Sequence, residues 1–300
     1  MERIGALAAF GTAVCWSISA IFFENASRKA GALAVNFWKV TFALVFLALA
    51  GTISRGMPLP FDASPNAWLY LSLSGIVGFV VADYFLFNAY ILIGSRITVI
   101  FQALTPLFTA LFAFLFLGER MKPQRLLGMA IVVGGILIVV LSRQKGQKSL
   151  GIPFSASKKG YIFASLSSVF QAGGLIFSKV GLGDYSSISG TQIRVLMAIA
   201  GFGIQALITR QSRQVFIAPM KERMIIKNIG IGAIFGPFLG VVFSLFALQN
   251  TGAGTASTLM ALTPVVIIIP SILILKQKVK SLEIIGAAIA VSGAALFFLL

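Results

Sequence analysis

The stretch Ala103-Leu104-Thr105-Pro106 returns unchanged 158 residues later as Ala261-Leu262-Thr263-Pro264. Upstream the match continues at an offset of 155 residues, which aligns Lys39 with Arg194. Each copy lies inside a long apolar run and is followed at the same spacing by paired glycines, Gly128 and Gly135 after the first copy and Gly286 and Gly293 after the second. Because self-similarity at one long spacing indicates a duplicated unit, the sequence predicts one unit of about 150 residues written twice.

The composition is that of a membrane protein. Of the 300 residues, 58% are hydrophobic and only 11% are charged, and the mean hydropathy is +0.98. A soluble domain needs about a quarter of its residues charged. The formal net charge of +16 is therefore interpreted as membrane topology and contact with anionic lipids. We expect no nucleic-acid partner, because no soluble domain is present to carry a basic binding face.

Ten apolar runs are each close to the ~20 residues that cross about 30 Å of hydrocarbon. We expect an all-α integral membrane protein of ten transmembrane helices, in which residues 1–142 and 160–300 form two five-helix repeats joined by a basic linker at 143–159. The third and eighth runs are long enough to be tilted or bent. The ten runs are 4–23, 34–54, 67–92, 97–117, 124–142, 160–179, 188–209, 226–249, 254–275 and 281–300.

Each repeat holds an odd number of spans, so the second repeat should enter the membrane upside down relative to the first. Inverted repeats are typical of transporters, because they provide two near-equivalent packings that expose a central site to one side of the membrane or to the other. The sequence therefore predicts a carrier that works by alternating access.

Basic residues outside the spans predict the orientation. The odd-numbered connections hold 16 Lys and Arg, whereas the termini and the even-numbered connections hold 6. The positive-inside rule places the basic connections in the cytoplasm and both termini on the far side. The odd-numbered connections are 24–33, 93–97, 143–159, 210–227 and 276–280.

Lys39, Asp83 and Arg194 are charged residues inside the spans, where a charge costs about 2.5–3.5 kcal/mol on insertion scales. Asp83 lies well inside the third run and is interpreted as a carboxylate that titrates a proton or binds a substrate ammonium, or as a structural partner of a cation. Lys39 and Arg194 occupy matched positions early in the second and seventh runs. They could hold substrate carboxylates or neutralise Asp83, or their long stems could reach the headgroups.

Other polar and aromatic residues of the spans are candidates for lining a transport path. Uncharged polar side chains can bond across helices or line the path, and aromatic rings can form a wall for an organic substrate or serve as interface anchors and packing. The candidates are Tyr84, Asn88, Gln102, Gln171, Trp16 and Trp38.

Pro106 and Pro264 close the repeated stretch in the fourth and ninth runs. Each proline removes a helical N–H and clashes with the carbonyl four residues back, at Gln102 and Met260. We expect a kink at each proline, either as a flexible hinge beside the transport path or as a fixed bend of the bundle.

The chain has no histidine and one cysteine, Cys15. The usual zinc, haem and Ser-His-Asp sites are therefore excluded, and no disulfide can form within the chain. No P-loop is present to bind a nucleotide. We expect no metal, no cofactor and no catalytic activity.

Ten spans in a five-plus-five repeat, with Leu-Thr-Pro in the fourth and ninth spans and the turn Leu117-Gly118-Glu119-Arg120 before a Gly-rich fifth span, resemble the EamA-type branch of the drug/metabolite transporter superfamily. In the second copy Leu275-Lys276-Gln277-Lys278 replaces that turn. The resemblance implies both termini in the cytoplasm, against the count of basic residues. The orientation stays open between the two.

The hypothesis is a secondary-active, multi-pass transporter of a bacterial inner membrane that exports a small organic metabolite, such as an amino acid or an analogue. Proton exchange through Asp83 is the expected coupling. The alternatives are a nucleotide-sugar or drug carrier of the same superfamily, or a passive channel. The expected partners are the small-molecule substrate and anionic lipids, and the protein is expected to function as a monomer, with a dimer left open.

Overall fold

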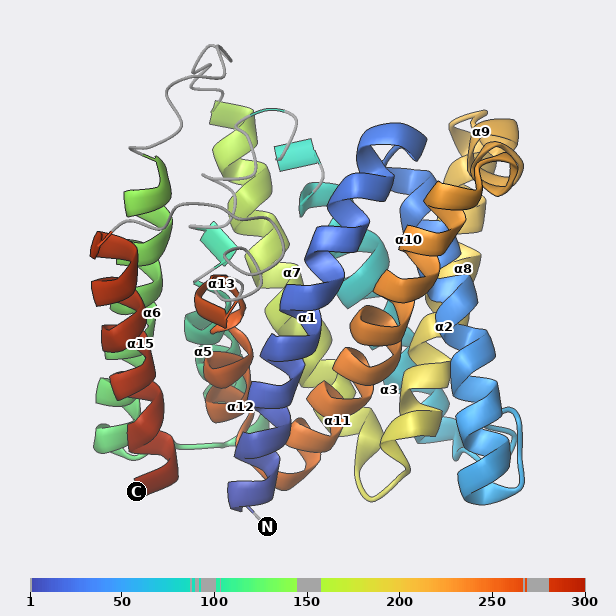
Figure 1. Ribbon diagram of the computed structural model, residues 1–300. Coiled ribbons are helices and arrows are strands. Elements are labelled where there is room, and N and C mark those ends of the chain that lie inside the picture. The colour runs from blue at the N-terminus through green and yellow to red at the C-terminus, as the bar shows by residue number, and fades with distance from the viewer. Residues whose placement is uncertain are drawn as a thin grey trace.

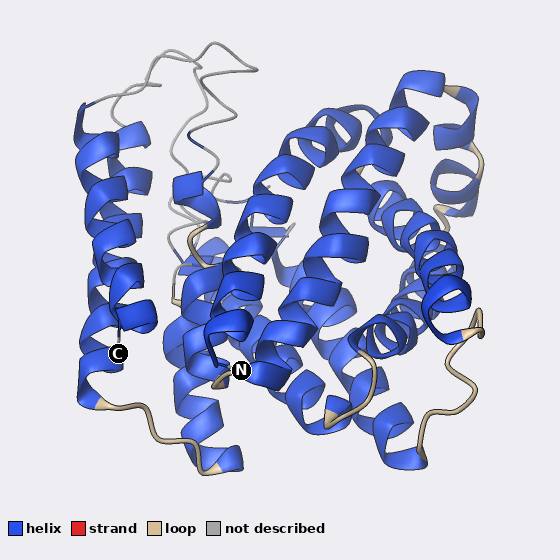
Figure 2. Cartoon of the chain, turned by 60° about the horizontal axis from the view of Figure 1, so that its bottom comes forward, coloured by secondary structure: helices blue, strands red, loops and turns tan. Residues whose placement is uncertain are grey.

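The computed structural model describes residues 2–86, 88, 89, 92, 101, 102, 104–144, 158–266, 268 and 281–299. Over these residues the chain is built of helices joined by short turns, and no strand occurs among them (Figure 2). The expected all-α class is thereby confirmed. Most of the predicted linker and the connections at 93–97 and 276–280 lie outside the described residues.

The first half begins with two long helices, α1 and α2, separated by Gly31. A third helix runs from Pro65 to Leu86 and contains a π-helical segment, η1. The bounds are α1 Glu2–Ala30, α2 Ala32–Arg55, α3 Pro65–Gly75, η1 Ile76–Val81, α5 Thr105–Leu117 and α6 Pro123–Gln144.

The second half repeats this order, with one long helix that again contains a π-helical segment, η4. The bounds are α7 Lys158–Leu182, α8 Ser187–Ile208, α9 Ser212–Phe216, η3 Ala218–Lys221, α10 Arg223–Ala233, η4 Ile234–Gly240, α11 Val241–Asn250, α12 Ala253–Met260, α13 Thr263–Val266 and α15 Ser281–Leu299.

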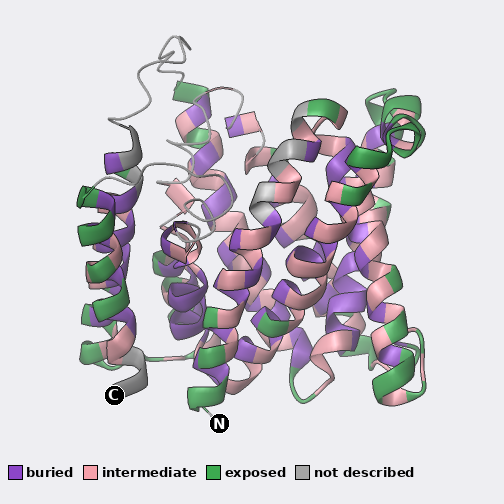
Figure 3. Ribbon diagram, viewed as in Figure 1, coloured by how far each residue is buried: buried purple, intermediate pink, exposed green. Residues whose placement is uncertain are grey.

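Within the described residues, five helices are long and apolar enough to cross a membrane. Their outer surfaces are apolar too: Ile53 is 87% exposed, Leu207 63% and Ile162 57%. Figure 3 shows the buried residues turned toward the middle of the bundle and the exposed ones on its outer helices and ends. Such a surface is stable only where the surrounding medium is itself apolar. The five helices are Ala32–Arg55, Pro65–Leu86, Lys158–Leu182, Ser187–Ile208 and Arg223–Asn250.

The helices lie side by side in one bundle with both chain ends on the same face (Figure 1). The pair α6 and α15 forms one edge, and α2 packs on α8 at the opposite edge. Between the edges, α1 packs on α10 and α11, α3 packs on α7, and α5 packs on α12. Helix α1 starts at the face that carries the termini, whereas α7 starts at the other face.

Glycines set the closest helix contacts. An added Cβ at Gly135 of α6 would lie 2.4 Å from the Ala290 backbone nitrogen and 2.7 Å from the Gly286 carbonyl oxygen of α15. At Gly293 it would lie 2.9 Å from the Gly128 carbonyl oxygen. Close backbone approach through small residues replaces the hydrophobic driving force that lipid does not supply. The paired glycines that recur in the two copies of the sequence are thus where α6 and α15 meet.

The long third and eighth apolar runs do not continue as regular α-helix. Both change to a π-helix, η1 at Ile76–Val81 and η4 at Ile234–Gly240, and η4 contains Pro237. A π segment widens the helix by one residue per turn and is frequent at functional sites. The two runs whose length predicted a tilt or a bend thus each contain a local irregularity.

The repeated prolines lie at the starts of helices. Pro106 lies in the first turn of α5, and Pro264 in the first turn of α13. Leu104 and residues 261–262 form turns directly before these helix starts, and the choice between a flexible hinge and a fixed bend at each proline stays a prediction. Proline is tolerated in a first turn, where its missing N–H has no helical partner to lose.

Serines of other helices satisfy backbone oxygens near these breaks. Ser168 Oγ of α7 donates to the Phe101 carbonyl oxygen at 2.6 Å, and Ser17 Oγ of α1 donates to the Thr263 carbonyl oxygen at 3.0 Å. An irregular backbone inside a membrane requires such partners. The breaks are therefore built into the packing of α5 against α7 and of α13 against α1.

Candidate functional site

An ion pair lies inside the bundle between α2 and the helix Pro65–Leu86. Lys39 Nζ is 3.2 Å from Asp83 Oδ2, and the two side chains are 14% and 8% exposed. The same ammonium lies 5.7 Å from the centre of the Phe23 ring on α1. The charged residues that the sequence singled out at 39 and 83 thus meet, where three helices converge.

A chain of hydrogen bonds adjoins this pair. Gln102 Nε2 donates to Ser167 Oγ at 2.8 Å, and Ser167 Oγ donates to the carbonyl oxygen of Ala82 at 3.0 Å. Because Ala82 directly precedes Asp83, Gln102 and α7 are brought next to the ion pair. Thr105 Oγ1, at the start of α5, contacts Gln102 Oε1 at 3.4 Å.

Arg194 lies on the inner face of α8 and is only 5% exposed. Its Cζ atom lies 4.9 Å from the centre of the Phe79 ring of η1. None of the ion pairs formed among the described residues includes Arg194, and its Nε has no hydrogen-bond partner there. Phe79 precedes Asp83 by four residues, so both basic side chains contact the same helix about one turn apart.

We call Lys39, Asp83, Gln102, Ser167 and Arg194 the polar cluster. Its members come from both halves of the chain, and every one is buried or nearly buried. The sequence predicted four of the five. Ser167 was missed, since serine is common in helices of all kinds and only its contacts distinguish it.

Of two further predicted residues, one lies on a helix of the cluster and the other on the neighbouring α1. Gln171 follows Ser167 by one helical turn on α7 and is partly exposed. Trp16 of α1 packs against Gly240 at the end of η4, where an added Cβ would lie 2.6 Å from Trp16 Nε1. Trp16 therefore occupies the space left by a glycine.

The structure does not bring Tyr84, Asn88 and Trp38 to the cluster. Tyr84 is 47% exposed and its ring lies against Phe85, while Asn88 Nδ2 donates to the Tyr84 carbonyl oxygen at 2.7 Å. Trp38 Nε1 donates to the Val215 carbonyl oxygen on α9 at 2.9 Å. These contacts assign the three side chains to the outer surface and to the end of the bundle.

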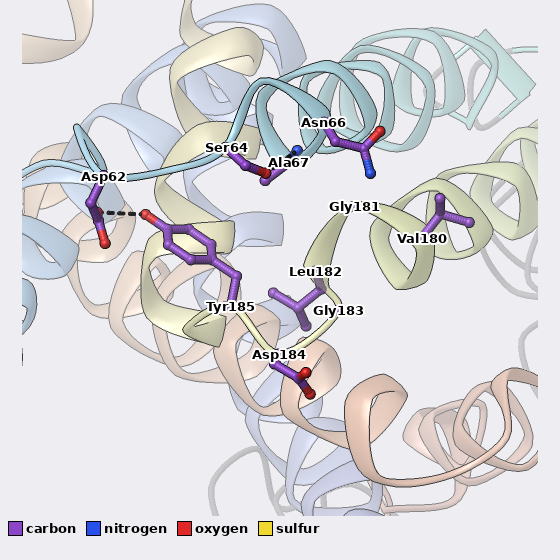
Figure 4. Close-up of a pocket in the computed structure, with 10 residues that line it drawn as sticks. All are labelled: Asp62, Ser64, Asn66, Ala67, Val180, Gly181, Leu182, Gly183, Asp184 and Tyr185. Atoms are coloured by element: carbon purple, nitrogen blue, oxygen red, sulfur yellow. Dashed lines mark hydrogen bonds between the residues drawn. The ribbon is translucent and has the colours of Figure 1, made fainter.

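Two hollows of the described surface lie elsewhere. One, of about 320 Å³, is an apolar groove on the outside of η1 and α8, lined by residues such as Val80 and Ile204. The other, of about 310 Å³, lies on the face of the termini between the loop before α3 and the turn from α7 to α8. Figure 4 shows Tyr185 reaching across the second hollow to Asp62, while Asp184 points away from this pair.

Asp62 lines that hollow and accepts hydrogen bonds from side chains of two other elements. Tyr185 donates to Asp62 Oδ1 at 2.8 Å, and Arg55 at the end of α2 donates to Oδ2 as well as to Ser189. The hydrogen bond from Tyr185 is the main cause that lowers the pKa of the Asp62 carboxyl, and burial is the main cause that raises the pKa of the Tyr185 phenol. This loop clamp links the two halves outside the helices.

The model of the EamA-like transporter family matches this chain twice, at residues 3–141 and 158–299. The two matches cover nearly the whole chain and divide it close to the predicted linker.

The chain belongs to the EamA-like transporter family.

As a member of this family, the EamA-like protein is a membrane transporter, and its apolar helices indicate that the chain crosses the membrane several times. The family consists of transporters, and the chain is therefore placed with them and not with enzymes.

Curated relatives are between 22% and 28% identical to this EamA-like transporter over the aligned residues. Phosphoenolpyruvate/phosphate translocator 1 of Oryza sativa subsp. japonica is 22% identical over 98% of this chain and 71% of its own length. An uncharacterized transporter of Clostridium kluyveri is 22% identical over 75% and 70%. The uncharacterized inner membrane transporter YhbE of Escherichia coli K12 is 28% identical over 35% and 32%.

A solved crystal structure, described only as that of a protein, shares the fold. It superposes with a TM-score of 0.76 at 19% identity and covers 100% of this chain and 98% of its own. At this identity the likeness concerns the architecture alone.

The turn that suggested the family has a structural role in this EamA-like transporter. Glu119 Oε1 lies 2.7 Å from Lys179 Nζ at the end of α7, and Glu119 Oε2 accepts a hydrogen bond from the Ala253 N–H at 2.8 Å. Lys179 Nζ also donates to the Thr251 carbonyl oxygen at 2.7 Å. This set, which we call the Glu119 latch, joins the first half to the start of α12. The sequence marked the turn as a motif but did not reveal its partners.

Proposed function

We propose that this protein is a secondary carrier in which residues 1–142 and 160–300 form inverted five-helix repeats, ten spans in all, that alternate about the polar cluster. The two family-model matches support the duplication. The opposite directions of α1 and α7 support the inversion (Figure 1).

Matched contacts support the same symmetry. Thr12 Oγ1 donates to the Gly240 carbonyl oxygen at 3.3 Å, and Ser167 Oγ donates to the Ala82 carbonyl oxygen at 3.0 Å. Thr12 and Ser167 are 155 residues apart, and Ala82 and Gly240 are 158 apart. These are the two offsets of the sequence repeat, so one contact is the counterpart of the other.

The observation that carries the carrier proposal is the buried Lys39–Asp83 pair. Ionisable groups inside a membrane bundle are costly and mark substrate or proton pathways. The pair lies where α1, α2 and the helix Pro65–Leu86 converge, beside a helix break and a π segment. Such discontinuities let one group of helices move against another.

The proposed substrate is a small organic metabolite, an amino acid or an analogue, exported across the bacterial inner membrane. Asp83 would exchange Lys39 for the substrate ammonium or for a proton, and this exchange couples the pH gradient to transport. Because the Asp83 carboxylate can satisfy only one of these partners at a time, the substrate and the proton would occupy the site alternately.

Counterflow of labelled substrate in proteoliposomes tests this proposal. The substrate is found first by screening which of a set of amino acids, nucleosides, polyamines and lipophilic cations raises the unfolding temperature of the purified protein. We expect Asp83→Asn to lose transport driven by a pH gradient, and Asp184→Asn, which changes an exposed carboxylate in a turn, to keep it.

Full gradient-driven transport by Asp83→Asn would clear Asp83 of the coupling role. Flux without counterflow would replace the carrier with a channel. Stabilisation by nucleosides or lipophilic cations alone would replace the amino acid with the other substrate classes of the superfamily.

A further inference from the structure

We propose that Arg194 is the anion-binding subsite of the transport path and takes a carboxylate or phosphate group of the substrate. This inference rests on the proposed carrier function and names the chemical class of its substrate.

Arg194 is buried without a counter-ion among the described residues. The residue is 5% exposed, and its Nε atom has no hydrogen-bond partner among the described residues. A guanidinium cannot give up its proton as a lysine can, so this charge persists in the bundle. An uncompensated buried charge is strongly unfavourable. A ligand anion would remove that cost whenever it binds.

The ring of Phe79 covers the guanidinium of Arg194 without neutralising it. With Cζ 4.9 Å from the ring centre, the contact is a cation–π interaction. A ring stacked on a guanidinium occupies its face, and the N–H groups point outward in the guanidinium plane. The ring therefore does not cover the edge that binds carboxylates and phosphates with two parallel hydrogen bonds, and the Nε atom on that edge has no partner among the described residues.

Glycines line the backbone that surrounds this guanidinium. An added Cβ on Gly78 of η1 would lie 3.5 Å from Arg194 Nη2 and 3.2 Å from the Cα of Gly174 on α7. The methyl group of an alanine would therefore already touch the guanidinium edge. Gly78 therefore lets both α7 and the Arg194 guanidinium lie close to η1.

The charges of the polar cluster do not balance. Lys39 and Asp83 neutralise each other at 3.2 Å, which leaves the cluster with the charge of Arg194. Because Phe79 and Asp83 are four residues apart on one helix, the points at which the two basic groups contact this helix lie about one helical turn apart. A substrate of a few carbon atoms spans that distance. Its anionic end would bind Arg194, and its other end would reach the Lys39–Asp83 pair.

Binding to the purified full-length protein tests the subsite. The probes are inorganic phosphate, phosphoenolpyruvate, succinate and L-alanine, with the cation putrescine and neutral glycerol for comparison. We expect at least one anion or zwitterion to raise the unfolding temperature in a saturable manner, and putrescine and glycerol to leave it unchanged. The probe with the strongest effect separates a phosphate-bearing substrate from a carboxylate-bearing one.

Three variants localise the effect. Arg194→Gln should lose the anion-induced shift, whereas Arg210→Gln, which changes an exposed arginine at the end of α8, should keep it. Arg194→Lys keeps the charge but not the two parallel donors, so its half-saturating concentration should rise severalfold. If Arg194→Gln does not fold, Arg194→Lys still tests the subsite.

The subsite is overturned if no anion or zwitterion stabilises the native protein. It is also overturned if Arg194→Gln responds like the native protein, or if Arg194→Lys has an unchanged half-saturating concentration. If the carrier proposal itself fails, the protein still binds anions in a manner that depends on Arg194, but it shows no counterflow. Counterflow that persists in Arg194→Gln with unchanged preference among the probes overturns only the subsite.

Discussion

At the scale of single residues, Lys39 and Asp83 each remove the cost of burying the other. Breaking a buried pair leaves one uncompensated charge and typically costs about 3–5 kcal/mol, whereas replacing both partners by apolar residues is often neutral. We therefore expect Asp83→Leu and Lys39→Met to destabilise the protein strongly as single changes, and the double variant to recover most of the loss. Unfolding temperatures of the four proteins in detergent measure this, and losses that simply add up in the double variant would show that the pair is not coupled.

Two neighbouring glycines of α6 should respond in opposite ways to alanine. At Gly135 the new Cβ meets backbone atoms of α15 within 2.8 Å, whereas at Gly134 nothing lies within 4 Å. Overpacking costs about 1–3 kcal/mol, and alanine in a helix is favoured over glycine by about 1 kcal/mol. Gly135→Ala should therefore lower the unfolding temperature and Gly134→Ala should keep or raise it. Equal effects would contradict the close contact of α6 with α15.

The loop clamp should respond to pH in a narrow range. The pKa of Asp62 is lowered from its ordinary 3.8, mainly by the hydrogen bond from Tyr185. A depressed carboxyl pKa stabilises the folded state above the unfolded pKa, and this contribution disappears as the pH falls through the folded value. The difference in unfolding temperature between the native protein and Asp62→Asn should stay constant from pH 8 to about 5 and shrink only as the pH falls below the ordinary pKa of 3.8, through the lowered pKa of the folded state. A difference that changes between pH 6 and 8 would exclude this explanation.

The residues of the cluster could be predicted from the sequence, but their partners could not. Lys39, Asp83 and Arg194 stood out because charges are rare and costly inside apolar runs. Which charges pair depends on how helices distant in the sequence pack, and a single sequence does not contain this. The same reasoning explains why Tyr84 and Trp38 were grouped with the site, although one faces outward and the other contacts α9.

At the scale of elements, each half combines a helix break with a π segment. The repeated prolines predicted an irregularity, and in the structure helices start at Thr105 and Thr263. The segments η1 and η4 begin at Ile76 and Ile234, 158 residues apart. The sequence indicated bends only through the length of these runs, because no residue pattern encodes a π-helix.

The Glu119 latch is predicted to fix the start of α12. Glu119→Ala removes the ion pair with Lys179 and the acceptor for the Ala253 N–H, and the loss of such a cap costs about 0.5–2 kcal/mol. Arg120→Ala changes the next residue, which is exposed, and is the matched control. The unfolding temperature should fall for Glu119→Ala and stay unchanged for Arg120→Ala. Equal unfolding temperatures for the two variants would show that Glu119 does not stabilise the start of α12.

At the scale of the whole molecule, the pairing of helices supports two halves related by a two-fold axis. The pairs α2 with α8 and α6 with α15 each join helices at matching positions of the two proposed repeats. The contact of α1 with α10 corresponds to that of α7 with α3. Under the proposed symmetry, each half contributes matching surfaces to the interface, and residues of both halves form the polar cluster.

The alternation of this interface is the central claim, and the reactivity of a cysteine at position 167 tests it most directly. Ser167 is buried, so it reacts only when the bundle opens. In a Cys15→Ser background, Ser167→Cys is treated with a membrane-impermeant thiol reagent in right-side-out and in inside-out vesicles. The account predicts reaction from both faces, with a transported substrate slowing one and speeding the other. Reaction from neither face, or from one face under all conditions, would contradict it.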